Sequence, residues 1–272
     1  MKPSTPLVYV IQAEDPPLAL KSRFGSQADW FTQALSQVNS PIQVIRPHAG
    51  DPLPAADDPH PVIISGSWAM VTDKADWSEA LASWIRLRYA SEAPLLGVCY
   101  GHQLMAYALG GLVHYHPKGR ELGCLPVWQV PLSLNEHEQA LLKGLPTRFY
   151  TFLTHQQTVL QPPPQARILL RSSHDTHQML SYRAGFYSVQ FHPEFTTPLL
   201  AACIHGRAEQ LAQEGYVVQD LLDGLQATPE ARTLLERFIR LYSPVLTEER
   251  KNSPGVTPIK SLKATTNADI LS

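Results

Sequence analysis

The stretch at residues 94–111 constrains the fold of this chain more than any other. A short apolar run at residues 95–98 leads into Cys99, which stands between Gly97 and Gly101, and apolar residues at helical spacing follow. The pattern predicts a buried strand, a sharp turn and a helix, with the cysteine on the turn. Gly-x-Cys-x-Gly is the thiol form of the nucleophile elbow, in which flanking glycines let the backbone pass closely.

A cysteine at this position could do more than pack. A free cysteine titrates near ~8.5, and the unpaired amides and macrodipole of a helix N-terminus lower that pKa. The same amides can stabilise an oxyanion, so one turn could supply both a nucleophile and part of an anion hole. The alternative is a buried structural cysteine at a strand end, which is common for free cysteine. The local sequence leaves both interpretations open for Cys99.

Strands and helices alternate through the first half of the chain. Strands are predicted at residues 7–11, 42–45, 62–64 and 95–98, helices at 27–38, 77–89 and 100–109, and loops at 12–25 and 47–61. This alternation predicts an α/β fold, with a parallel sheet and helices on both of its faces. Ligands of such sheets bind beyond the carboxyl ends of the strands, where Cys99 and residues 65–67 both fall.

The second half consists mainly of short strand-like runs separated by turn residues. They occur at residues 113–116, 124–130, 149–151, 167–170, 178–182 and 187–191, and they predict an antiparallel or mixed extension of the sheet. One helix is expected over residues 198–213, and another from an N-cap at Thr228 to Tyr242. Residues 1–245 are expected to form one domain, and residues 246–272, which lack periodicity, a disordered tail.

Composition argues against several function classes. The 272 residues carry a formal net charge of −2, which gives no electrostatic case for nucleic acid or an anionic membrane. No apolar run approaches the ~20 residues that span a bilayer, and the first residues do not resemble a secretory signal. The three cysteines, Cys99, Cys124 and Cys203, lack metal-binding spacing, so we expect a cytoplasmic protein without a metal or cofactor.

A nucleophilic cysteine needs a base, and His192 is the strongest of the 11 histidines. It follows an alternating strand, and Glu194 stands two residues later, so in extended chain both side chains point to the same side. A carboxylate so placed can fix the tautomer of the imidazole and stabilise its charged form. On this spacing alone, a turn with both side chains solvated is the simpler interpretation.

Three motifs, in this order, resemble those of the class I (triad) glutamine amidotransferases. They are LGVCYGHQ at residues 96–103, THQQTV at 154–159 and QFHPE at 190–194. The chain looks most like stand-alone proteins related to the amidotransferase half of GMP synthase, and the similarity covers about residues 5–200. Each motif is modest alone, but together they make an inert Cys99 the weaker interpretation.

The resemblance implies a flavodoxin-like fold and hydrolysis of the side-chain amide of L-glutamine. Cys99 would attack the side-chain carbonyl to form a γ-glutamyl thioester and release ammonia. His192 would protonate the leaving amine and then activate water, and Glu194 would orient His192.

The resemblance also assigns the groups around the reaction. The oxyanion would be held by the Tyr100 amide and by one from Gly66 or Ser67. The amino-acid end of the substrate would be held by Gln103, Thr154, His155 and Gln156. The family usually has glycine where this chain has Ser67, and serine would be costly there if φ were positive.

Three functions follow from these patterns. The first is an amidotransferase or glutaminase; because the chain has no phosphate-binding loop motif, its ammonia could pass to a separate synthetase chain. The second is a hydrolase of γ-glutamyl peptides or γ-glutamyl amines that uses the same thioester. The third is a binding or regulatory protein that keeps the fold with weak activity.

Overall fold

The computed structural model describes residues 7–38 and 40–243. The predicted tail at 246–272 and the end of the predicted domain at 245 lie outside the described residues. No helix in the described part is long and apolar enough to cross a membrane.

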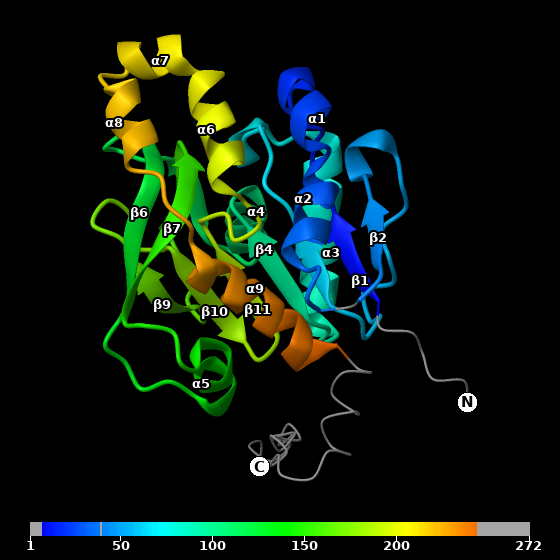
Figure 1. The fold of residues 1–272 in the computed structure, drawn as a ribbon. Helices are drawn as coiled ribbons and strands as arrows, with labels where there is room; N and C mark the ends of the chain where they lie inside the picture. The colour runs from blue at the N-terminus through cyan, green and yellow to red at the C-terminus, as the bar shows by residue number, and fades with distance from the viewer. Residues whose placement is uncertain (1–6, 39, 244–272) are drawn as a thin grey trace, which may run out of the picture.

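A nine-stranded mixed sheet forms the centre of the described part (Figure 1). In spatial order its strands are β2 (Ile42–Ile45), β1 (Val8–Ile11), β3 (Val62–Ile64), β4 (Leu95–Val98), β11 (Phe186–Val189), β10 (Met179–Arg183), β9 (Arg167–Arg171), β6 (Glu121–Gln129) and β7 (Arg148–His155). The five strands from β2 to β11 are parallel, and the pairings from β11 to β7 are antiparallel. The predicted mixed α/β sheet is therefore confirmed.

Helices cover both faces of this sheet (Figure 1). One face carries α2 (Gln27–Ala34), α5 (Glu136–Leu142) and α9 (Pro229–Tyr242). The other carries α3 (Asp76–Ala90) and α4 (Tyr100–Ala108). The period of two within a strand explains this division, because Ile63 packs on the first face while Val62 and Ile64 pack on the second. Strands covered on both faces read as continuous apolar runs, as β3 and β4 do.

A helical cap closes one end of the sheet. It comprises α1 (Leu18–Phe24), α6 (Thr197–His205), α7 (Ala208–Gln213) and α8 (Val218–Asp223), which group together at one end of the molecule (Figure 1). Apolar side chains from these helices pack with Trp30 of α2 and with Phe152 of β7 in a third core cluster. The cap therefore lies where β7 ends, close to the predicted reaction centre.

Several sequence predictions were wrong in this region. The expected loop at residues 12–25 contains α1. The sequence has no capping signal for this helix, because its N-cap residue is Pro17, whose side chain cannot accept a hydrogen bond. The single helix expected at residues 198–213 is divided into α6 and α7, since the first ends at Gly206. Helix α8 was not expected. Outside the cap, two short 3-10 turns occur at Pro47–Ala49, within the predicted loop at 47–61, and at Val71–Asp73.

A second, two-stranded sheet pairs β5 (Leu112–Tyr115) with β8 (Gln157–Gln161). The predicted strand near residue 113 therefore does not extend the main sheet. Residues 154–157, which begin the THQQTV motif, form the end of β7, a turn at Gln156 and the start of β8. This turn is consequently held by two sheets at once, which fixes the edge of the cavity described next.

Candidate active site

Cys99 occupies a strained turn between β4 and α4. Its backbone has φ 52° and ψ −99°, a conformation that non-glycine residues rarely adopt. Its amide donates to the carbonyl of Val189 at 2.8 Å, which ties the turn to the end of the parallel strand β11. The flanking glycines are required by contact: a Cβ on Gly97 would lie 2.5 Å from the Gly101 carbonyl oxygen, and one on Gly101 2.5 Å from that of Ile64. The predicted elbow is therefore present.

His192 reaches the same place from the end of β11. Its Nδ1 lies 2.7 Å from Glu194 Oε1, and its ring stacks on Phe195 with centroids 4.0 Å apart. Its backbone amide donates to the Phe152 carbonyl at 2.9 Å. Both His192 and Glu194 are buried, so they do not form the solvated turn that the spacing alone allowed. Nε2 of His192 has no hydrogen-bond partner among the residues described.

Charge couples the thiol to this imidazole. Burial acts to raise the pKa of Cys99, but the charge of His192, with a smaller contribution from His155, outweighs burial and lowers that pKa. Burial acts to lower the pKa of His192, but the charges of Glu194 and Cys99 outweigh it and raise that pKa. The Cys99 sulfur and His192 Nε2 do not meet in regular hydrogen-bond geometry. The opposite pKa shifts of the two side chains nevertheless favour a Cys99 thiolate beside a His192 imidazolium.

The backbone amides of Gly66, Ser67 and Tyr100 border this pair. None of the three donates to a protein acceptor in the described part of the chain, so all remain available as donors. A Cβ on Gly66 would lie 2.9 Å from His192 Cε1 and 3.6 Å from Cys99 Cβ, which places the Gly66 backbone directly against both side chains. The cost expected for Ser67 does not arise, because Ser67 is not among the described residues with positive φ.

Glu14 holds the loop at residues 67–69, here called the Ser67 loop, in place. No sequence pattern indicated this role. Its Oε2 accepts from the Ser67 hydroxyl at 2.8 Å and from the amides of Trp68 and Ala69, both at 2.9 Å. Two successive amides of the loop are thereby turned towards Glu14. One carboxylate thus fixes the loop conformation that leaves the preceding amides unpaired.

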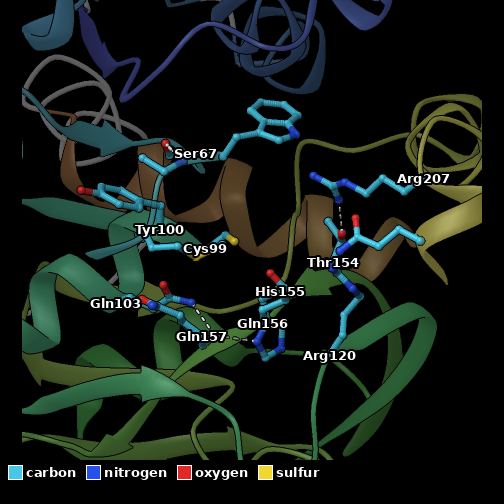
Figure 2. Close-up of a pocket in the computed structure, with 14 residues that line it drawn as sticks. Ser67, Cys99, Tyr100, Gln103, Arg120, Thr154, His155, Gln156, Gln157 and Arg207 are labelled. Carbon is cyan, nitrogen blue, oxygen red and sulfur yellow. Dashed lines mark hydrogen bonds between the residues drawn. The ribbon is translucent and has the colours of Figure 1, made fainter. Parts of the chain in front are cut away.

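The Cys99 sulfur faces a cavity of about 190 Å³ (Figure 2). Gln103 and Arg207 border it from opposite sides in this view. Gln103 Nε2 donates to the Gln157 carbonyl at 2.7 Å and to Gln190 Oε1 at 3.0 Å, so both of its hydrogens are used. The side-chain oxygen of Gln103 is therefore the group that this residue can offer to a ligand, and an oxygen acceptor suits an ammonium.

The residues expected at the substrate edge are brought together at this cavity, but their side chains differ in availability. Thr154 and Gln156 line it and are partly exposed. His155 lines it too, yet its Nδ1 donates to the Gln157 carbonyl and its Nε2 lies 2.9 Å from Glu121 Oε2. The ring therefore has no nitrogen left for a ligand, and the substrate contact that the family resemblance implies for His155 stays a prediction.

The buried Glu121–His155 pair belongs to a polar cluster beneath the cavity. Burial acts to lower the pKa of His155, but the hydrogen bond and charge of Glu121 outweigh it and raise the pKa. In the described part, Glu121, His155 and Asp175 are the one group whose ligand atoms lie close enough to hold a metal ion. Both His155 nitrogens are already engaged in hydrogen bonds, so the arrangement suits an ion pair better than a metal site.

Two arginines of the cavity were not predicted. Arg120 is paired with Glu214 through two hydrogen bonds, at 2.8 and 3.1 Å. Arg207, between α6 and α7, donates to the Thr154 hydroxyl at 3.2 Å (Figure 2), and no carboxylate in the described part pairs with it. Both lie in segments whose sequence reads as an ordinary polar surface, so no local pattern marks them. They give one end of the cavity a positive charge.

Known relatives share this arrangement of strands and helices. A glutamine amidotransferase from Thermotoga maritima superposes with a TM-score of 0.70 at 20% identity, covering 88% of this chain and 98% of that one. A glutamine amidotransferase from Methylobacillus flagellatus superposes with a TM-score of 0.66 at 24% identity, covering 87% and 95%. These likenesses establish the fold, a flavodoxin-like α/β sheet.

Sequence comparison adds the family. Gamma-glutamyl peptidase 4 of Arabidopsis thaliana is 30% identical over 176 residues, which are 65% of this chain and 68% of that protein. The glutamine-hydrolyzing GMP synthase subunit of Ignicoccus hospitalis is 35% identical over 123 residues, but the match spans only 58% of its length and 45% of this chain. Residues 24–200 match the family described as glutamine amidotransferase class-I. The chain therefore belongs to the class I glutamine amidotransferases.

Proposed function

We propose that this protein hydrolyses the γ-amide of L-glutamine through a covalent γ-glutamyl thioester on Cys99. The observation that carries the proposal is the buried thiol on a strained elbow beside an imidazole that is itself oriented by a carboxylate. A nucleophile, a base and an orienting group in this relation form the triad of covalent hydrolases.

In the first step, the Cys99 sulfur attacks the side-chain carbonyl carbon of glutamine. The charge that develops on the carbonyl oxygen is met by the free amides of Tyr100 and of Gly66 or Ser67. His192 donates its proton to the departing nitrogen, and the carbon–nitrogen bond breaks to leave the thioester. The raised pKa of His192 keeps this proton available.

In the second step, His192 takes a proton from water, which attacks the thioester and releases glutamate. Glu194 stabilises the imidazolium that forms and keeps Nε2 directed away from itself, because Nδ1 is hydrogen-bonded to its carboxylate. Charge complementarity orients the substrate: its ammonium faces Gln103 Oε1, and its carboxylate faces the end of the cavity with Arg120 and Arg207.

The relatives suggest two uses for this chemistry. Similarity to the glutamine-hydrolyzing GMP synthase subunit supports an amidotransferase whose ammonia passes to a separate synthetase chain. Similarity to gamma-glutamyl peptidase 4, which is matched over more of its length, supports a second candidate: hydrolysis of γ-glutamyl peptides. Both use the same thioester and differ only in the leaving group.

The test is ammonia and glutamate release from L-glutamine by the purified full-length chain. We expect both products in equal amounts and their loss in Cys99→Ala. Cys124→Ala is the matched control, because burial raises the pKa of that thiol and it does not line the cavity. Equal turnover by Cys99→Ala and the natural chain would refute the proposal. Binding of glutamine without any turnover would favour a regulatory protein instead.

A further inference from the structure

The Cys99 sulfur borders a second space, on the side away from Gln103. A narrow neck there is lined by Cys99 and His192 and does not reach Gln103. A groove of about 450 Å³ lies next to this neck, between α1 and α6. Three residues, Trp68, Cys203 and Arg207, line both the neck and the groove, so the two spaces adjoin each other.

His192 determines which part of a substrate would enter the neck. A general acid must lie within reach of the nitrogen that it protonates, so the leaving amine departs on the His192 side of the sulfur. The cavity at Gln103 does not include His192, whereas the neck does. The γ-glutamyl part and the leaving amine are therefore directed into different spaces.

The groove is larger than ammonia requires. A molecule the size of water takes up about 30 Å³, whereas small-molecule sites have volumes of about 300–1,000 Å³. Its walls are largely apolar and include Leu20, Phe24 and Ala202. A groove of this size and lining suits an organic group rather than a dissolved gas.

The permanently charged side chains of the groove have one sign. Its lining includes Arg23 and Arg207 and contains no aspartate or glutamate. Arg23 lies over the Phe24 ring at 5.0 Å, and no carboxylate in the described part of the chain pairs with it. An unpaired arginine beside an apolar wall complements a ligand that has both an apolar body and a carboxylate.

We propose that this groove is the subsite for the leaving amine and that it takes an apolar amino acid or short peptide with a free carboxylate. The inference rests on the thioester chemistry proposed above and names its substrate class: γ-glutamyl peptides. The sulfur–carbon bond forms at the γ-carbonyl, the amide carbon–nitrogen bond breaks, and the peptide leaves as a neutral amine with the proton of His192. Water then releases glutamate and restores the thiol.

Three substrates test the groove on the full-length chain. They are L-glutamine, γ-glutamyl-leucyl-glycine and the C-terminal amide of that tripeptide, which lacks only the negative charge. All three give the same thioester, so differences in kcat/KM report on the leaving group alone. We expect the free acid to exceed its amide by about threefold to fivefold, the range for a partly exposed charge pair.

Variants of α1 separate the groove from the reaction centre. Arg23→Met should abolish most of the preference for the free acid, and Ala19→Glu should reverse it through like-charge repulsion. Lys21→Met is the matched control, because Lys21 lies on the same helix but outside the groove lining. None of the three variants should change kcat/KM for L-glutamine.

Two outcomes would overturn the inference while the proposed function stands. One is turnover of L-glutamine with cleavage of neither tripeptide, which would fit a groove that receives a partner chain. The other is equal cleavage of both tripeptides that Arg23→Met leaves unchanged. If none of the three substrates is turned over, the proposed function itself fails, and the inference fails with it.

Discussion

Replacing Gly66 by alanine tests the spatial relation between the anion hole and the imidazole. The added methyl carbon would lie 2.9 Å from His192 Cε1, whereas ordinary contacts begin near 3.4 Å. Either the ring or the loop must therefore give by about 0.5 Å. The ring cannot retreat freely, because Phe195 stacks on it at 4.0 Å and Glu194 holds Nδ1 at 2.7 Å.

The size of the effect follows from this displacement. A misplacement of about 1 Å at a reacting centre can lower the rate by ~10²-fold, so 0.5 Å should lower kcat/KM for L-glutamine by about tenfold. Gly66 does not have a positive φ, so alanine adds no backbone strain there. The roughly tenfold loss of kcat/KM in Gly66→Ala should consequently come without a large fall in melting temperature.

The assay is steady-state release of ammonia together with a thermal unfolding curve. Gly224→Ala is the matched control, because that glycine ends α8 in a right-handed conformation, and its added carbon meets only helix carbonyls at 3.3 Å or more. Unchanged kcat/KM in Gly66→Ala would show that this loop does not border the reaction. An equal loss in both variants would point to general destabilisation.

Three further predictions concern charge and burial. Because the charge of His192 outweighs burial and lowers the pKa of Cys99, alkylation of that thiol by iodoacetamide should show its acid limb at higher pH in His192→Ala than in the natural chain. Arg88 is fully buried, and its guanidinium donates to three backbone carbonyls. Arg88→Met removes these hydrogen bonds and should lower the free energy of unfolding by about 3 kcal/mol and the melting temperature by about 6–12 °C. An unchanged melting curve would contradict this. The hydrogen bond and charge of Glu121 outweigh burial and raise the pKa of His155, and the resulting stabilisation is complete below the unfolded pKa of ~6.5 and is lost as pH rises through the raised pKa. The loss of unfolding free energy in Glu121→Gln, measured with urea, should therefore be larger at pH 6 than at pH 9. A loss that does not change with pH would argue against a charged His155.

Patterns of short range allowed most of the sheet to be predicted. Strands β2, β3 and β4 have the bounds expected from the sequence. For β3 and β4 the signal is a continuous apolar run, because these strands are buried on both faces. The long-range relation between Cys99 and His192 came from motif resemblance. The parallel pairing of β4 with β11 then explains it, since parallel neighbours bring their carboxyl ends to one edge.

Features that depend on tertiary contacts could not be predicted in this way. Helix α1 buries only Leu20 and is stabilised by packing against the helical cap, so its sequence carries little helical signal. The clamp by Glu14 joins residues more than 50 positions apart, and nothing near Glu14 in the sequence indicates it. Arg207 likewise reads as helix surface until the fold turns it towards the thiol.

Intact-mass spectrometry of the rapidly quenched reaction with L-glutamine tests the central claim most directly. The account predicts that the chain gains the mass of one γ-glutamyl group, that the label maps to Cys99 after proteolysis, and that it is absent from Cys99→Ala. A label on another residue, or glutamate release that persists in Cys99→Ala, would contradict the account.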